Sequence, residues 1–308
     1  MPWSGAAFLA YAGGFTLLVA ALSLLAVQAD EHGDAGLVFW AVIVLAAVGV
    51  LAYAALESGH RVIAGLLGIA CVAAFCVLIG GLLAWFGWWP ENVGLGFREF
   101  DFWLLVFELL TFLASIAAWR IFRFPLLLFL VALSGWHFVT DLVSNGGDWS
   151  AVVTVLVGVL LFVAAGAADT DESRISGFWL HVAAGLAIGG GILWFFHDGD
   201  IDWILVGLAG LAYIAIGERL ARSSWVVLGA WGLLQTATNF AEKWSDATDL
   251  FPFTYLLFPF FFFDFESDGQ PTPWAGPVVY AALGLVFFAL AMLVARRRRA
   301  VTPGADLI

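Results

Sequence analysis

The sequence predicts an all-α integral membrane protein, and three observations lead to that fold class. Hydrophobic residues make up 63% of the 308 positions and charged residues only 12%, against about 25% charged in an average soluble domain. The apolar residues form successive runs close to the ~20 residues that a helix needs to cross the hydrocarbon layer. The short polar breaks between these runs alternate between basic and acidic. We therefore expect a polytopic helical bundle of successive hairpins, forming a single membrane domain over 1–308 with no soluble domain.

Ten apolar runs have the length and composition of membrane spans. The expected ranges are 5–28, 36–56, 62–89, 102–119, 124–143, 149–168, 176–197, 201–217, 224–241 and 273–295. The first run is too long for the apolar core of a signal peptide and follows no Lys or Arg, so we interpret it as a membrane helix. Cys71 and Cys76 lie five positions apart in the third run. On a helix they point about 140° away from each other, so no mutual disulfide is expected.

The distribution of basic residues predicts how these spans are oriented. Ten of the twelve follow even-numbered spans, and only Arg98 and Lys243 follow odd-numbered ones. Because basic loops stay on the cytoplasmic side, both termini are expected in the cytoplasm. Most acidic residues fall in the opposite breaks, which predicts an acidic outer face that attracts cations. Tryptophans near the predicted outer ends, typical of an aromatic belt, include Trp85, Trp88, Trp103 and Trp149.

A Phe-rich segment at about 250–265 breaks the pattern of spans. It is too short to cross the membrane, and Pro252 and Pro259 interrupt a helix there. A full span would also place the Arg296–Arg299 tail outside, against the positive-inside rule. We therefore expect an interfacial or re-entrant element on the outer side. A cytoplasmic arginine precedes four of the hairpins, a periodicity that either the topology alone or an internal duplication would produce.

Glu108 is the leading candidate for chemistry inside the membrane. Ionisable groups at membrane depth are costly and usually face the interior of a bundle. Thr111 and Ser115 follow Glu108 at helical spacing and share its face. The three residues predict a site for a proton or a cation. The structural alternative is a buried, protonated Glu that bonds to a neighbouring helix.

Two further polar stripes are predicted near the outer ends of the spans. His137 and Asp141 lie four positions apart, a spacing that lets the carboxylate orient the imidazole. Gln235 and Asn239 form a stripe at the end of the ninth span, where they would line a wet cavity. Bonding between helices is the alternative for both stripes. We expect the Glu108, His137/Asp141 and Gln235/Asn239 faces to converge on one cavity.

The positions of the histidines and the outer acidic residues also allow a metal site or a haem site. An external metal site would use the candidates His32, His197, Asp198 and Asp200. Two axial haem pairs would draw on histidines at two depths, His60 and His181 toward the cytoplasm and His137 and His197 toward the outside. Chance placement of five histidines explains this distribution as well. The sequence alone therefore implies no cofactor.

These observations predict a multi-pass carrier or channel for a small molecule or cation, with an acidic, aromatic outer vestibule. The chain lacks Gly-x-Ser-x-Gly, His-Glu-x-x-His and Walker motifs, which disfavours those enzyme classes, and it has no nucleic-acid patch. The absence of an Asn-x-Ser/Thr site fits the plasma (inner) membrane of a prokaryote. One alternative is a non-catalytic subunit or scaffold that binds lipid or a partner protein through its outer face. Another is an intramembrane enzyme or a haem-binding electron carrier.

Overall fold

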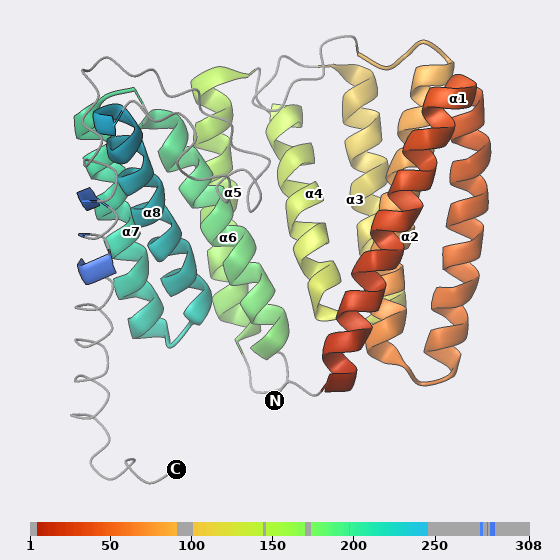
Figure 1. Ribbon diagram of the computed structural model, residues 1–308, viewed down its shortest axis with the longest axis horizontal. Coiled ribbons are helices and arrows are strands. Elements are labelled where there is room, and N and C mark those ends of the chain that lie inside the picture. Colours follow the sequence, from red (N-terminus) through yellow and green to blue (C-terminus); the bar gives the residue numbers. More distant parts are fainter. Residues whose placement is uncertain are drawn as a thin grey trace, which may run out of the picture. The chain divides into compact units, whose positions relative to one another are not determined.

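The computed structural model describes residues 5–90, 101–143, 146–169, 174–196 and 198–245, together with 278, 279, 282 and 284–286. Its helices, shown in Figure 1, are α1 (Gly5–Glu57), α2 (Arg61–Trp85), α3 (Phe102–Phe122), α4 (Pro125–Val143), α5 (Gly147–Ala168), α6 (Arg174–Phe195), α7 (Asp200–Leu220) and α8 (Ser223–Ser245). No strand occurs in these ranges. The predicted all-helical class is confirmed for this part of the chain.

Among the residues that the structure describes, seven helical segments are long and apolar enough to cross a membrane, namely Ala29–Glu57, Arg61–Trp85, Phe102–Phe122, Pro125–Val143, Gly147–Ala168, Ile175–Phe195 and Asp200–Leu220. They match seven of the predicted spans in order and support a multi-pass membrane protein. The segment 224–241 is helical within α8 but is not among the seven. The Phe-rich segment and most of 273–295 lie outside the described residues. The count of ten spans and the interfacial segment therefore stay predictions.

α1 consists of two helices joined at a kink. Gly33 has φ 63° and ψ −162°, a backbone conformation outside the helical region that glycine adopts without a steric penalty. Leu25 and Ala41 are buried in one cluster, although the 16 positions between them would span about 24 Å of straight helix. The two parts of α1 therefore fold back on each other (Figure 1). The polar stretch 29–35, expected as an open break between spans, is instead helical on both sides of Gly33.

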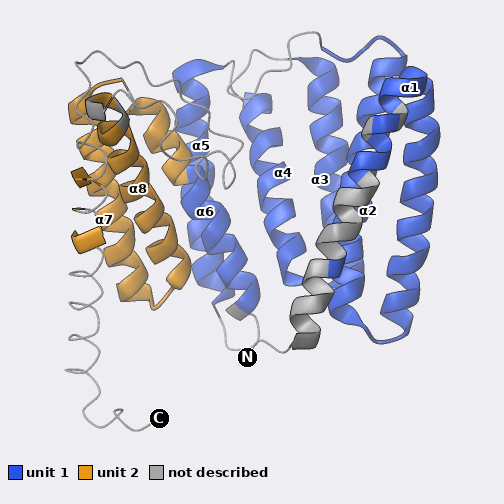
Figure 2. Cartoon of the chain, viewed as in Figure 1, with its two compact units in different colours: residues 1–187 blue, residues 188–308 orange. Residues whose placement is uncertain are grey.

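The chain divides into two compact units, Met1–Ala187 and Ile188–Ile308, and the division falls inside α6 (Figure 2). In the first unit, helices that follow one another along the chain pack together, from α1 against α2 to α4 against α5. This arrangement is the predicted series of hairpins. Trp136 of α4 joins α5 through a hydrogen bond that its Nε1 donates to Thr154 Oγ1 at 2.9 Å.

Small residues allow the helices of the first unit to approach closely. Gly65 and Gly68 of α2 receive the rings of Phe124 and Phe122, and a side chain at either glycine would collide with these rings. Gly135 of α4 receives the ring of Phe112 in the same way. Close packing at small residues replaces the hydrophobic driving force that helices lack between one another in lipid.

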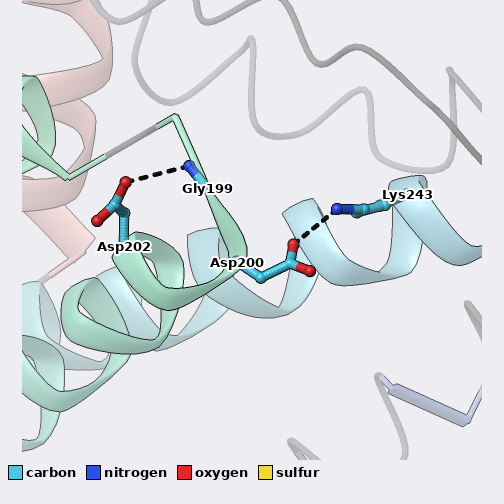
Figure 3. A network of polar contacts seen from close by, with 4 residues as sticks. All are labelled: Gly199, Asp200, Asp202 and Lys243. Atoms are coloured by element: carbon cyan, nitrogen blue, oxygen red, sulfur yellow. Dashed lines mark hydrogen bonds and ion pairs between the residues drawn. The ribbon is translucent and has the colours of Figure 1, made fainter.

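In the second unit, α7 and α8 form a tightly packed hairpin. A Cβ atom at Gly210 would lie 2.8 Å from the carbonyl oxygen of Gly229, so the two backbones meet there without side chains between them. At the open end of the hairpin, Lys243 Nζ lies 2.8 Å from Asp200 Oδ1 (Figure 3). Lys243 is one of the two basic residues predicted on the acidic side, and the ion pair gives it a partner there.

Candidate functional site

Glu108 is buried on α3, with 7% of its surface exposed. α3 packs against both α2 and α4. The helix begins at Phe102 because the Asp101 side chain accepts a hydrogen bond from the Leu104 backbone N–H at 2.9 Å and caps the first turn. Glu108 lies six positions further, about 9 Å along the helix axis. The carboxyl group is therefore held inside the span, away from the helix end.

Two hydroxyl groups follow Glu108 along α3. Ser115 is 1% exposed, and its Oγ donates a hydrogen bond to the Thr111 carbonyl oxygen at 2.9 Å. Thr111 Oγ1 lies 3.4 Å from Cys76 Sγ of α2, with either atom able to donate. The structure thus places Cys76 beside the predicted polar stripe, a contact that the sequence did not indicate. Cys71 and Cys76 are both free thiols in the structure.

α4 brings further polar groups to the level of Glu108. Phe112, one turn from Glu108, contacts Gly135 and stacks on Phe138 with ring centres 6.2 Å apart. Because α3 and α4 form a hairpin and run in opposite directions, Glu108 lies at about the level of Thr140 and Asp141. Thr140 is buried and Asp141 is half-buried. A carboxyl group, a hydroxyl and a second carboxyl group therefore occur at one depth of the first unit.

His137 is not buried with this group. Its side chain is exposed, and its ring centre lies 4.4 Å from that of Trp136. Trp136 in turn bonds to Thr154 of α5. One turn of α4 separates His137 from Asp141, as the spacing in the sequence predicted.

Gln235 and Asn239 lie on α8 in the second unit. Gln235 is buried and Asn239 is half-buried. Beside them, the hydroxyl of Thr236 lies within hydrogen-bonding distance of two carbonyl oxygens, Trp203 at 3.1 Å and Gly232 at 3.0 Å. Thr236, next to this stripe along the chain, thus serves the contact between α7 and α8. Convergence of Gln235 and Asn239 with Glu108 stays a prediction, because these residues belong to different units.

Three of the residues considered for a metal site, His32, Asp198 and Asp200, are described by the structure. No three His, Cys, Asp or Glu side chains come together among the described residues in a way that would hold a metal ion. His32 and Glu31 are exposed, and His32 Nδ1 lies 3.9 Å from Glu31 Oε2. Asp198 is also exposed, and Asp200 forms an ion pair with Lys243. His197 lies outside the described residues.

The structure reveals a buried polar pair, His181 and Asp169. His181 of α6 is 2% exposed, and its Nε2 lies 3.1 Å from Oδ2 of Asp169, the residue that follows α5. The ring of Phe162 meets the imidazole edge to face at 5.7 Å. A side chain at Gly177 would collide with the Asp169 carboxylate. The pair therefore depends on glycine at that position.

Sequence reasoning considered His181 only as a haem ligand and did not weigh Asp169. The ring nitrogen Nε2 of His181 is engaged by a carboxylate, whereas His60, its proposed partner in an axial pair, is exposed at the start of α2. The sequence does contain a signal for this pair. Asp169 follows one span, and Gly177 and His181, four positions apart, lie near the start of the next.

No family model, curated protein sequence or solved structure matches the chain. The functional assignment therefore rests on the residues themselves. A buried carboxyl group with hydroxyl groups at the same depth has two chemical uses. It can accept and release a proton, or it can supply oxygen ligands to a cation.

Proposed function

We propose that the protein is a membrane carrier or channel for a small molecule or cation, with Glu108 as its central polar group. One observation carries the proposal: a carboxyl group is 7% exposed on a helix that packs between two other apolar helices. Burying such a group costs several kcal/mol, and an apolar side chain of similar size would often be more stable there. We therefore assign a functional role to the carboxyl group at this depth.

The neighbours of Glu108 support a cationic or protonic substrate. Thr111 and Thr140 add hydroxyl oxygens at or near the same depth, and Asp141 adds a second carboxyl group. Oxygen atoms of these kinds bind hard cations. In the proposed orientation, with both termini in the cytoplasm of a prokaryote, the acidic loops face outward and raise the local cation concentration.

Flux through vesicles containing the purified full-length protein tests the proposal. Two probes cover the substrate classes: ⁸⁶Rb⁺ uptake for a monovalent cation, and proton entry reported by a pH-sensitive dye sealed inside the vesicles. Glu108→Gln removes the charge while keeping size and shape, and we expect it to reduce the flux at least tenfold. Glu57→Gln is the matched control, because Glu57 is an exposed carboxylate at the end of α1.

Two results would disprove the proposed role. Wild-type vesicles that pass neither probe faster than empty vesicles would remove the evidence for ion transport. Equal flux for wild type and Glu108→Gln would remove the role of the carboxyl group. Circular dichroism and gel filtration of each variant establish that a loss of flux does not reflect misfolding.

A second candidate function, a non-catalytic subunit or scaffold, is favoured by exposed aromatic rings at one end of α2 and α3. Trp85, Phe86, Trp88 and Phe102 are all exposed there, and the Trp88 ring stacks on Trp103 at 4.2 Å. An aromatic belt at the headgroup level is the simpler explanation. A scaffold would show no flux with either probe, and it would lose a stably bound partner when Phe86 and Trp88 are changed to Ala. The haem alternative is tested by the absorption spectrum, because a colourless protein contains no haem.

A further inference from the structure

Two exposed arginines lie together at the end of the first unit that is remote from the Gly33 kink. Arg61 begins α2, and Arg123 lies in the turn between α3 and α4. Both side chains are exposed, and in the described part of the chain neither forms an ion pair. The exposed Glu57 at the end of α1 is likewise not paired with either arginine in that part of the chain. Within the described residues, both arginines at this end therefore lack an ion-pair partner.

The packing of two rings holds these arginines near each other. Phe122 and Phe124, on either side of Arg123, contact Gly68 and Gly65 of α2. Arg61 lies four positions before Gly65 and seven before Gly68, on the same face of α2. The turn that carries Arg123 is thus held against the first turns of α2, on the face from which Arg61 emerges.

Arg123 has an unusual backbone conformation. Its φ of 47° and ψ of 37° place it in the left-handed region, where side chains are disfavoured and glycine is the usual residue at a helix C-terminus. Arg123, in this left-handed position, is one of the two arginines without an ion-pair partner among the described residues.

Two helix N-termini add to the positive potential. α2 starts at Arg61 with no side-chain cap from His60, and α4 starts at Pro125, directly after the Phe124 that contacts Gly65. In these first turns the N–H groups of Arg61, Ala64 and Leu127 already donate to backbone carbonyl oxygens, and Pro125 has no N–H group. The remaining first-turn N–H groups lack intrahelical acceptors and favour an anion nearby. Around them, Val62, Ile63 and Ile121 expose aliphatic surface. The combination fits a ligand with an anionic head and an apolar tail.

We propose that Arg61, Arg123 and the N-termini of α2 and α4 bind the headgroup phosphate of an anionic phospholipid. The exposed aliphatic side chains contact the first part of its acyl chains. The basic end is the one that the positive-inside rule assigns to the cytoplasmic leaflet, where anionic lipids are enriched. This site does not depend on whether the protein transports anything.

Lipid titration of the purified full-length protein in a neutral detergent tests the site. Dioleoyl-phosphatidylglycerol and dioleoyl-phosphatidylcholine share acyl chains and differ in headgroup charge, and native mass spectrometry counts bound lipids at each concentration. We expect the wild type to bind the anionic lipid at least tenfold more tightly. Arg61→Gln and Arg123→Gly should each weaken that binding about fivefold, the factor expected for one basic residue near an anionic surface.

Arg120→Gln is the matched control. Arg120 is an exposed arginine in the last turn of α3. It lies two positions before Phe122 and thus on roughly the opposite side of the helix from the contact with α2. Binding of the anionic lipid should change less than twofold in this variant. Arg123→Gly also relieves the left-handed strain, so its melting temperature without lipid should be no lower than that of the wild type, which separates lost binding from lost folding.

Three results would overturn the assignment. Equal affinity of the wild type for the two lipids would show that the headgroup charge is not recognised. An equal loss in Arg120→Gln would show a general effect of net charge rather than a local site. Inorganic phosphate that displaces the anionic lipid at equal concentration would assign the site to a free anion instead of a lipid.

Discussion

Alanine at Gly229 should destabilise the α7–α8 hairpin, whereas alanine at Gly232, one turn away on the same helix, should not. A Cβ atom at Gly229 would overlap the carbonyl oxygen of Gly210 and lie 2.9 Å from the backbone nitrogen of Ile214. Backbone atoms in a packed helix cannot rotate aside as a side chain can. A Cβ atom at Gly232 would lie 3.5 Å from the nearest atom, the Gly210 Cα, which is ordinary van der Waals contact.

The magnitude follows from two opposing terms. Overpacking in a close-packed interface costs roughly 1–3 kcal/mol, and the contacts at Gly229 place it at the upper end of that range. Replacing glycine by alanine in a helix stabilises the helix by up to about 1 kcal/mol. The free energy of unfolding should therefore fall by about 1–2 kcal/mol in Gly229→Ala and rise by up to about 1 kcal/mol in Gly232→Ala.

Unfolding in mixed micelles with increasing denaturing detergent, followed by tryptophan fluorescence, measures both values. Trp203 and Trp225 are buried in this unit and report on the contact between the helices. The decisive quantity is the difference in free energy of unfolding between the two alanine variants, because both carry the same chemical change in the same helix. If Gly229→Ala were as stable as Gly232→Ala, the close backbone approach of α7 and α8 would be wrong.

Two further predictions concern polar pairs. Asp169→Ala leaves His181 buried without its carboxylate partner and should lower the free energy of unfolding by about 2 kcal/mol. Asp169→Asn keeps an oxygen acceptor, so its free energy of unfolding should fall by less. Thermal unfolding measures both variants, and an equal loss of stability would argue against the hydrogen bond. The Asp200 and Lys243 side chains are 51% and 38% exposed, so their ion pair should contribute no more than about 1 kcal/mol. A double-mutant cycle with Asp200→Asn and Lys243→Met measures that coupling, and a value above about 2 kcal/mol would contradict the exposed geometry.

The sequence predicted several residues of the candidate site, but it did not predict which side chains of neighbouring helices contact them. Glu108, Thr111 and Ser115 stand out because ionisable and polar groups are rare in an apolar run, and their spacing places them on one helix face. The contact of Thr111 with Cys76 depends on how α2 and α3 are rotated about their axes. Apolar periodicity does not reveal that rotation, because side chains facing lipid are as apolar as those facing another helix.

The exposed position of His137 likewise depends on how α4 is rotated about its axis. Sequence spacing correctly places His137 and Asp141 on one stripe of α4, but a stripe alone does not say which neighbour it faces. Trp136, the adjacent residue, turns to α5 and bonds to Thr154. Asp169 was overlooked because it follows a span and reads as an ordinary loop acid, although it is held against His181.

The sequence by itself determined the helical class, the order of the seven matched spans and the turns between them. These follow because a backbone in hydrocarbon must satisfy its own hydrogen bonds, so an apolar run of ~20 residues has a helix as its stable form. Only the tertiary structure decided that the break between the first two spans is a kink at Gly33 within helix, and it alone decided the glycine contacts between neighbouring helices and the pairing of His181 with Asp169. These features depend on helix rotation and register, which are set by side-chain shape at each contact and leave no trace in hydropathy.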